Sequence, residues 1–319
     1  MNKSTKPDTF SVRIVSIDDQ HQGQRIDNFL TTLLKGVPKT YIYRILRKGE
    51  VRVNKGRVKP EYRLNTGDQV RIPPVRTSAA NTGPSPDNPV LRRLENSILY
   101  EDGDVIVLNK PAGIAVHGGS GVDFGVIEGM RVLFPKAKRL ELVHRLDRDT
   151  SGCLLLAKKA SILKSLHEQI RSGAMKKHYQ ALVVGRLERA IDKVDVPLKK
   201  FVAKNGERFV KVDREGKSAT TLVKVERLFH HASLLSLELL TGRTHQIRVH
   251  CAHIGHPIIG DEKYGDEQYN QQSRTKGIKR LCLHARRLQF SIPGKDKVID
   301  IVAPLDNAFQ AAIATLEKE

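Results

Sequence analysis

The sequence predicts an α+β protein of two domains: a small α/β head, then a larger body built on a mixed, largely antiparallel sheet. Three observations support this fold class. Residues 73–90, PPVRTSAANTGPSPDNPV, contain five prolines and little that could be buried, which is typical of an exposed linker. Helix and strand patterns occur on both sides of it. The long strand patterns after it come in neighbouring pairs separated by helices, without a regular βαβ rhythm.

The chain is long enough for these two domains. It has 319 residues, and its 39% apolar content is adequate for a core and excludes global disorder. We expect an N-terminal extension at 1–22, the head at 23–80, a linker at 81–92 and the body at 93–319. No apolar run approaches the ~18 residues of a membrane-spanning helix. The first residues lack the apolar stretch of a secretory signal, so we expect a cytoplasmic protein.

The formal net charge is +20, which calls for a partner of opposite sign. Nucleic acid is the usual partner of such a chain, and an anionic membrane surface is the second possibility. The third interpretation is a basic enzyme whose charge has no specific partner. The charge is uneven, because residues 1–80 hold 16 Lys and Arg against 7 Asp and Glu. A quarter of the chain therefore carries nearly half of the surplus.

Two helices are expected in the head. The first spans Gln24–Leu34, and the second follows Pro38 and ends before Gly49, as an N1 proline and a C′ glycine indicate. Their apolar residues recur at helical spacing. In the first helix these are Ile26, Phe29, Leu30 and Leu33; in the second they are Tyr41, Ile42, Ile45 and Leu46.

The opposite face of the second helix is basic. It presents Lys39, Tyr43, Arg44, Arg47 and Lys48. The following segment, VRVNKGRVKP, alternates apolar and basic residues around Asn54-Lys55-Gly56, which is a hairpin signal. GDQVRIP reads as a closing strand. The helix and hairpin together would form one basic patch.

The head resembles the S4 RNA-binding domain. The resemblance lies in GQRIDNFL at 23–30, VPKTYIYRILRKGEVRVNKGRVKP at 37–60 and GDQVRI at 67–72. It implies that the head grips RNA mainly through backbone charge and shape. The residues expected to do so are Lys39, Tyr43, Arg44, Arg47, Lys48 and Lys55.

The body shows both kinds of pattern. Strands are expected at Val105–Leu108, Cys153–Ala157, His178–Val184, Thr220–Arg227, Ser233–Leu240, Leu281–Phe290 and Val298–Ile301. Helices are expected at Val126–Phe134, Ser161–Arg171, Arg243–Ile254 and Asn307–Glu317.

Three body segments are candidates for chemistry. VHRLDRDTSG at 143–152 runs into an apolar strand, which would hold its polar groups rigidly beside a cleft. TGRTHQIRVHCAHIGH at 241–256 begins a helix on which Arg248 is free to face a cleft. Lys177-His178-Tyr179 opens a strand. A structural role is the alternative for two of these segments. Residues 143–152 could be a surface loop whose charges pair with one another, and Tyr179 could only fill the core.

A metal site is the competing interpretation of the second segment, which contains His245, His250, His253 and His256. His250 and His253 could share a helix face, and zinc accepts such a pair, but no fourth ligand of obvious type lies nearby. Three scattered cysteines without C-x-x-C argue against a disulfide framework and a zinc ribbon. The absence of P-loop, G-x-G-x-x-G and G-x-S-x-G patterns removes support for nucleotide, NAD or serine-hydrolase chemistry.

The whole body resembles the RluA-type pseudouridine synthases. The motifs, in the family's order, are ILYEDGDVIVLNKPAG at 98–113, HRLDRDTSG at 144–152, KHYQALVVG at 177–185, TGRTHQIRVH at 241–250, GHPIIGDEKYG at 255–265 and LCLHARRL at 281–288. The resemblance implies an isomerase that converts uridines of 23S ribosomal RNA to pseudouridine. This chemistry is redox-neutral and needs no cofactor and no metal.

The resemblance also assigns roles to particular residues. Asp147 would be the catalytic carboxylate, acting either on C1′ or on a sugar proton. Arg248 would be its partner, because a guanidinium favours an ionised carboxylate in a pocket. Tyr179 would lie beneath the uracil, and Arg145 would fill the vacancy left by the flipped base. A phosphate contact is the alternative for Arg145. Asp149 matches a variable position of the family and is not expected to act.

We expect 23S ribosomal RNA as partner, no membrane association and a monomer. The alternative function is a non-catalytic ribosome-assembly factor whose body is only an RNA-shaped platform. A third possibility is a metal nuclease built on the histidines.

Overall fold

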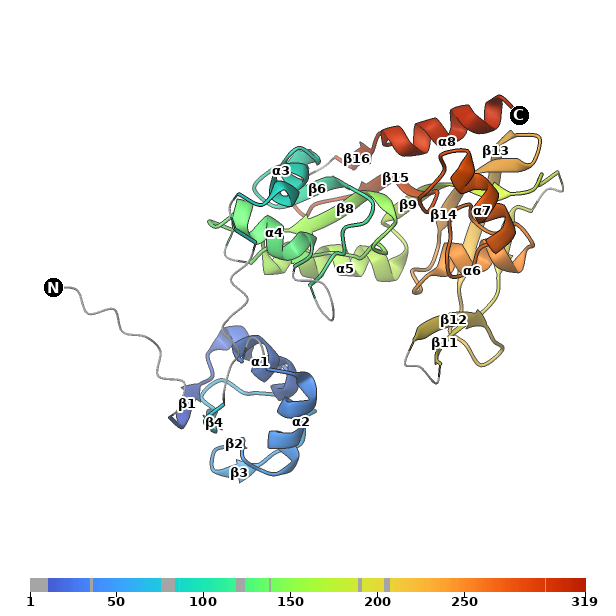
Figure 1. Cartoon of the computed structure of the whole chain (residues 1–319). Coiled ribbons are helices and arrows are strands. Elements are labelled where there is room, and N and C mark those ends of the chain that lie inside the picture. Colours follow the sequence, from blue (N-terminus) through green and yellow to red (C-terminus); the bar gives the residue numbers. More distant parts are fainter. Residues whose placement is uncertain are drawn as a thin grey trace. The chain divides into compact units, whose positions relative to one another are not determined.

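The computed structural model describes residues 11–34, 37–75, 84–85, 87–118, 124–137, 139–188, 191–203, 207–295 and 297–319. The chain divides into two compact units, Met1–Thr82 and Gly83–Glu319, which we call the head and the body (Figure 1). The division falls in the segment expected as the linker.

The head is a four-stranded antiparallel sheet with two α-helices. Its elements are β1 (Arg13–Ser16), the 3-10 helix η1 (Asp19–His21), α1 (Ile26–Leu33), α2 (Lys39–Arg47), β2 (Arg52–Val53), β3 (Gly56–Arg57) and β4 (Gln69–Ile72). The strand order is β1-β4-β2-β3. The expected apolar faces of both helices are buried, including Ile26, Phe29, Ile42 and Ile45. The two helices and the closing strand are therefore confirmed.

The turns of the head follow from the local sequence. Gly49 has φ +68° just after α2. Its N–H donates to the Leu46 carbonyl at 3.0 Å, and the Glu50 N–H donates to the Ile45 carbonyl at 2.9 Å, which is the Schellman pattern. Asn54 and Lys55 both have positive φ, as a type I′ turn between β2 and β3 requires. The hairpin signal is thus confirmed.

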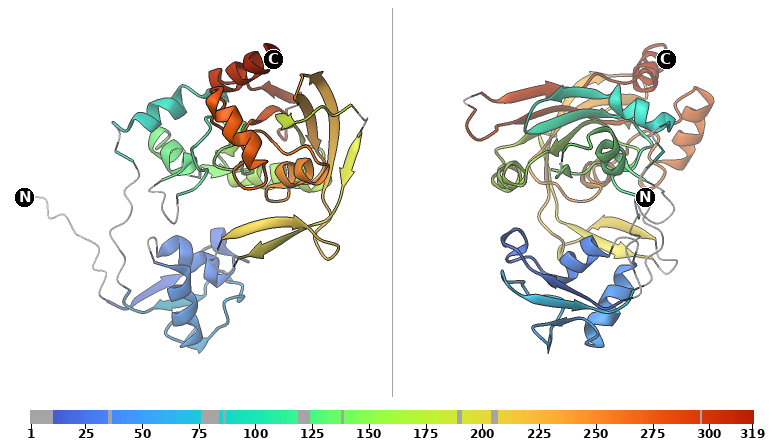
Figure 2. Two further views of the ribbon diagram at one scale, coloured as in Figure 1. Left: turned by 45° about the vertical axis from the view of Figure 1, so that its right-hand side comes forward. Right: turned by 90° about the vertical axis from the view of Figure 1, so that its left-hand side faces the viewer.

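A ten-stranded mixed sheet forms the centre of the body (Figure 2). Its main path is β10-β13-β14-β9-β15-β8-β6-β5, with β16 on β15 and β7 on β8. Of the pairings in the described sheet, β8 with β15 is parallel and the others are antiparallel. The predicted fold class is confirmed.

The body strands and helices have the following bounds. The strands are β5 (Ile98–Glu101), β6 (Val105–Lys110), β7 (Glu141–Leu142), β8 (Ser151–Ala157), β9 (Lys176–Val184), β10 (Lys193–Asp195), β11 (Leu198–Val202), β12 (Arg208–Val212), β13 (Thr220–Leu228), β14 (Ala232–Leu239), β15 (Leu283–Phe290) and β16 (Ile299–Val302). The helices are α3 (Pro89–Glu95), α4 (Val126–Leu133), α5 (Ala160–Ser172), α6 (Gln246–His253), α7 (Glu267–Thr275) and α8 (Asn307–Glu317).

Helix–sheet packing gives the body one main core. The strands β6 and β8 are almost wholly buried, and α4, α5 and α8 add apolar residues such as Met130, Leu166 and Phe309 to the same cluster. Among the described helices, none is both long and apolar enough to cross a bilayer.

The structure differs from expectation in the linker and at the start of one helix. Helix α3 begins at Pro89, inside the expected linker, because Asn88 caps its first turn and Leu91 and Leu94 are buried against α4. The helix expected at Arg243–Ile254 begins only at Gln246. His245 has φ +53° and ψ +21°, and this left-handed conformation delays the helix.

β11 and β12 form a separate two-stranded hairpin that extends away from the sheet (Figure 1). Its inner residues Leu198 and Val210 are buried in a small cluster with Val249 of α6 and with Tyr264. This hairpin was not expected from the sequence, because its strands are short and rich in lysine.

The parallel pairing of β8 with β15 depends on Gly152. Its φ is +106°, and a Cβ there would overlap the backbone of Ala285. No other residue type fits, and the loop 143–150 enters the sheet at this point.

We predict that Gly152→Ala strongly destabilises the body, because the strands must separate to admit the methyl group. Gly173→Ala is the matched control, since Gly173 also has positive φ but open space around its Cβ position. The control should lose about 1 kcal/mol of unfolding free energy in urea and Gly152→Ala clearly more. Equal losses would contradict the close-approach argument.

Candidate active site

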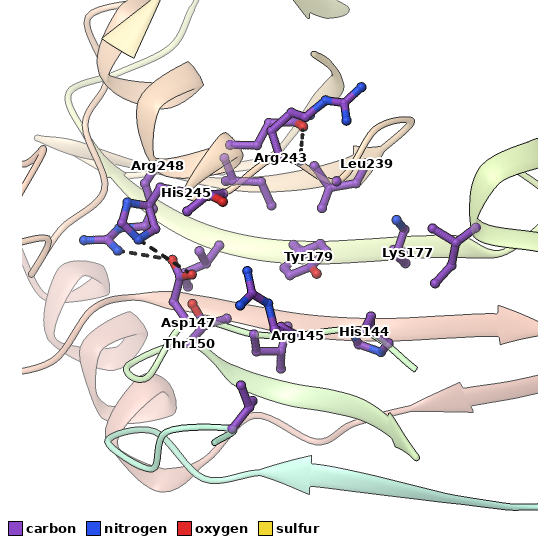
Figure 3. A pocket seen from close by; sticks show the side chains of 18 of the residues that line it. His144, Arg145, Asp147, Thr150, Lys177, Tyr179, Leu239, Arg243, His245 and Arg248 are labelled. Carbon is purple, nitrogen blue, oxygen red and sulfur yellow. Dashed lines mark hydrogen bonds and ion pairs between the residues drawn. The ribbon is translucent and has the colours of Figure 1, made fainter. Parts of the chain in front are cut away.

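The three expected segments of the body meet at one pocket of about 680 Å³ (Figure 3). The loop before β8, the start of β9 and the turn leading into α6 line it. The lining includes His144, Arg145, Asp147, Thr150, Lys177, Tyr179, Arg243, His245 and Arg248. Asp147 is the carboxylate among the described lining residues.

Asp147 is paired with Arg248 across the pocket. The Arg248 Nη1 donates to Asp147 Oδ2 at 3.1 Å, and the two residues lie 101 positions apart in the chain. The Asp147 side chain is 29% exposed and that of Arg248 is 12% exposed. A carboxylate that is paired yet open to the pocket can contact a bound substrate.

A second carboxylate fixes Arg248 from behind. The Arg248 Nε and Nη2 each donate to Asp261 at 2.7 Å, in the bidentate geometry typical of strong pairs. Asp261 Oδ1 also accepts from the backbone N–H groups of Lys263 and Tyr264. Burial raises the pKa of Asp261, but the hydrogen bonds and charge of Arg248 outweigh it and hold the pKa below the usual range.

The guanidinium is correspondingly held in its charged form. Burial lowers the pKa of Arg248, but the hydrogen bonds and charge of Asp261 raise it by more, and Asp147 makes a smaller contribution in the same direction. The net effect is a raised pKa. The Tyr264 ring lies 5.1 Å below the guanidinium carbon, which adds a cation–π contact. Arg248 is thus a fixed, fully charged donor for Asp147.

Tyr179 lies on the pocket wall. It comes from β9, its side chain is largely buried, and it is one of the lining residues labelled in Figure 3. Burial raises the pKa of its phenol, and the charge of Asp147 acts in the same direction. The hydroxyl therefore stays protonated at neutral pH.

Arg145 is exposed and points into the pocket near Asp147 and Tyr179 (Figure 3). No ion pair within the described ranges engages it. Asp149, by contrast, is exposed and is not part of the described pocket lining. The alternation of the loop thus places Arg145 and Asp147 on one side.

A buried lysine that the sequence analysis left without a role holds this loop. The Lys110 ammonium donates to the carbonyl oxygens of Pro111, Ile114 and Arg148 at 2.8–2.9 Å. Lys110 is fully buried, and this burial lowers the pKa of its side chain to about 7. Because one ammonium joins the turn after β6 to the loop that carries Asp147, it fixes the loop against the sheet.

Burial also shifts the pKa of two further lining residues, His144 and Lys177. His144 accepts a hydrogen bond from the Leu155 N–H at 3.3 Å, and burial lowers its pKa to about 4, so the ring is neutral. Burial also lowers the pKa of Lys177. Neither residue was singled out for a role from the sequence.

The histidines considered as metal ligands point to different partners. His250 Nδ1 lies 2.9 Å from the Thr221 hydroxyl, and His256 Nδ1 lies 2.9 Å from the Val184 carbonyl. His245 is directed to Tyr264 and Asp147. In the described ranges no group of three or more His, Cys, Asp or Glu residues could hold a metal ion.

The expected RNA-binding residues of the head are all exposed: Lys39, Tyr43, Arg44, Arg47, Lys48 and Lys55. In the part of the head that is described, no ion pair to an acidic residue engages the five cations. The Arg44 guanidinium lies 4.3 Å from the Tyr41 ring. The Tyr43 hydroxyl, however, donates to buried Asp27 at 2.9 Å, so Tyr43 ties α2 to α1 while its ring remains exposed.

The chain is similar to known proteins in both its head and its body. A family model described as RNA pseudouridylate synthase matches residues 104–253, and an S4 domain model matches residues 24–70. A Salmonella typhimurium protein named ribosomal large subunit pseudouridine synthase C is 55% identical over 98% of both chains. The chain belongs to the RNA pseudouridine synthase family. It is thus an RNA-modifying isomerase with an S4 domain, as expected from the sequence.

A further relative and a solved structure belong to the same family. An Escherichia coli K12 protein of the same name is 54% identical over 98% of both chains. Together with VHGGSG at 116–121 and HRLDRDTSGCLLLAKK at 144–159, these relatives make the chain similar to ribosomal large subunit pseudouridine synthase C. Among solved structures, human RNA pseudouridylate synthase domain containing 4 has a TM-score of 0.59 at 27% identity, covering 71% of this chain and 95% of its own.

We predict that Asp261→Asn lowers the unfolding free energy at pH 7 by about 3 kcal/mol, because Arg248 loses its buried partner. The pKa of Asp261 is lowered by folding, so its contribution is complete above the unfolded pKa and is lost as pH falls through the folded one. The penalty should therefore shrink below pH ~4.

Urea unfolding at pH 7 and at pH 3.5 measures this difference. Asp300→Asn is the control, because Asp300 pairs with Arg287 at the surface and should leave stability nearly unchanged. A pH-independent penalty for Asp261→Asn would contradict the electrostatic account.

Proposed function

We propose that this protein isomerises specific uridines of 23S ribosomal RNA to pseudouridine, with Asp147 as the catalytic carboxylate. The observation that carries the proposal is the pocket in which Asp147 faces the cavity while paired with Arg248. The relatives' names, which specify the large ribosomal subunit, support the substrate.

The reaction breaks the C1′–N1 bond, turns the detached uracil and joins its C5 to C1′. The C5 hydrogen leaves as a proton, and N1 gains one, so the change is redox-neutral. A pocket of about 680 Å³ is of the size that takes one flipped nucleotide.

One available carboxylate suits this chemistry. Glycoside hydrolases commonly use two, one of which can direct water to the sugar. Here Asp261 is fully buried, and its oxygens are occupied by Arg248 and two backbone amides. Asp147 can therefore act at the sugar, on C1′ or on a sugar proton, without a second carboxylate among the described lining residues to activate water.

The neighbouring side chains confine the substrate. A protonated Tyr179 offers an aromatic surface beneath the uracil, which limits how far the detached base can move. Arg145, exposed and unpaired among the described residues, is suited to enter the stack and offset the cost of flipping, a few kcal/mol. A phosphate contact is its alternative role.

The head supplies affinity in this proposal. The cations of α2 and the β2–β3 turn, Lys39, Arg44, Arg47, Lys48 and Lys55, can neutralise phosphates, and Tyr43 can contribute its exposed ring. We further propose that the protein acts as a cytoplasmic monomer. The alternative, a non-catalytic assembly factor, leaves the arrangement of Asp147, Arg248 and Asp261 without a purpose.

We predict that Asp147→Asn abolishes pseudouridine formation and leaves RNA affinity within about twofold. Asp149→Asn is the matched control, a neighbouring exposed carboxylate, and should keep full activity. Carbodiimide-adduct primer extension on 23S ribosomal RNA from cells carrying only each variant measures the outcome. Unchanged pseudouridine stops with Asp147→Asn would refute the assignment and favour the assembly-factor alternative.

We also predict that replacing both Arg44 and Arg47 by alanine weakens RNA binding and flattens its salt dependence. Each lost phosphate contact should reduce the slope of log K against log salt by roughly 0.9 on duplex or 0.7 on single strands. Filter binding between low and moderate salt measures the slope. Replacing Arg92 and Arg93, exposed on α3, is the control, and an equal effect there would refute a specific patch on the head.

A further inference from the structure

His245 occupies an unusual place between two polar groups of the pocket. Its Nδ1 lies 2.8 Å from the Tyr264 hydroxyl, and its Nε2 lies 3.9 Å from Asp147 Oδ1. The ring packs edge-on against Tyr264, with centroids 5.5 Å apart. Figure 3 shows the imidazole beside Arg248, on the side of the pocket that Asp147 faces.

The backbone of His245 is held in a conformation that histidine rarely adopts. Its φ of +53° and ψ of +21° lie in the left-handed region. Such conformations cost of the order of 1–3 kcal/mol and persist where surrounding contacts enforce them, often at functional sites. The residue immediately precedes α6, yet its side chain forms no capping hydrogen bond. The strain instead directs the imidazole towards Asp147.

The hydrogen bonds of Tyr264 favour one position of the proton on the His245 ring. The Tyr264 hydroxyl accepts from the backbone N–H of Val210 at 2.9 Å. Its own proton is therefore available for donation to His245 Nδ1, and in that arrangement Nδ1 is the acceptor. Burial raises the pKa of Tyr264, so this proton is present at neutral pH. In a neutral ring the remaining proton is then on Nε2, which faces Asp147.

Burial favours the neutral form of that ring. Burial lowers the pKa of His245, and the charges of Arg248 and Lys263 lower it further. Asp147 and Asp261 act in the opposite direction, but the net shift is downward. His245 therefore offers Asp147 a neutral N–H donor rather than a second positive charge.

We propose that His245 is a positioning residue for the catalytic carboxylate, with its Nε2–H directed at Asp147 Oδ1 and its tautomer fixed by Tyr264. The proposal rests on the proposed function. Arg248 holds Oδ2, and the imidazole adjoins Oδ1, so the two donors together set the rotation of the carboxylate plane.

The present separation suits a contact that tightens with substrate. Catalytic hydrogen bonds are often long in the free enzyme and shorten in the complex. A shift of about 1 Å would bring Nε2 and Oδ1 within hydrogen-bonding distance. Since a neutral donor orients the carboxylate without a full opposing charge, Asp147 remains able to act on the sugar.

His245→Asn and His245→Gln separate positioning from folding. Asparagine tolerates the left-handed conformation and can accept from Tyr264, but it is too short to reach Asp147. Glutamine can place an amide N–H near the position of Nε2. His253→Asn is the matched control, an exposed histidine at the end of the helix that His245 precedes.

The assay is single-turnover tritium release from 23S ribosomal RNA labelled with [5-³H]uridine, combined with RNA binding and thermal melting. We expect His245→Asn to lower the rate by about 10- to 100-fold with RNA affinity and melting temperature nearly unchanged. His245→Gln should recover a substantial part of the rate, and His253→Asn should match the wild type.

A second variant covers the case in which His245→Asn folds poorly. Tyr264→Phe removes the hydroxyl that fixes the tautomer but keeps the ring, and it should lower the rate several-fold without weakening RNA binding.

The outcomes distinguish this proposal from the function on which it rests. A wild-type protein that releases no tritium overturns the proposed function and the positioning role together. An active wild type with a fully active His245→Asn variant overturns only the positioning role. A rate loss that glutamine does not relieve and that parallels lost thermal stability also overturns it, since a purely structural histidine would behave so.

Discussion

The site depends on the Arg248 guanidinium, which joins two carboxylates of opposite character. Asp261 is buried and takes two of the guanidinium's hydrogen bonds, so Arg248 cannot turn away from the pocket. The remaining donor meets Asp147, which is open to the cavity. One carboxylate thus anchors the arginine, and the arginine orients the other. The anchored pair supplies charge and orientation before any substrate binds, which is the condition for electrostatic preorganisation.

The fold brings these distant residues together through a few fixed points. Gly152 lets the strand after Asp147 run directly against the backbone of β15. Lys110 draws three carbonyl oxygens of two loops onto one ammonium. The Tyr264 hydroxyl connects the β11–β12 hairpin, through the Val210 amide, to His245. Each point is polar or glycine-dependent and joins a segment that lines the pocket to another part of the body.

The sequence was sufficient for the fold class and for the elements that carry strong local signals. Apolar periodicity predicted the long strands, and Asp147, Arg248, Tyr179 and Arg145 were selected from motifs that the pocket brings together. Asp261 lies within the motif GHPIIGDEKYG, yet its role required knowing that its side chain is buried behind Arg248. His245 was read only as a possible metal ligand, because its left-handed backbone and its contact with Tyr264 cannot be inferred from spacing. The lysine-rich β11–β12 hairpin was missed because its apolar face packs against residues distant in sequence.

The most direct test of the central claim is the single-turnover rate of an Arg248→Lys variant on 23S ribosomal RNA. Lysine keeps the positive charge but cannot form the bidentate pair with Asp261 and reach Asp147 at the same time. The account predicts a rate at least about 100-fold below the wild type with RNA affinity preserved. A lysine variant that converts uridine at the wild-type rate would show that charge alone is enough, and it would contradict the proposed role of the anchored arginine.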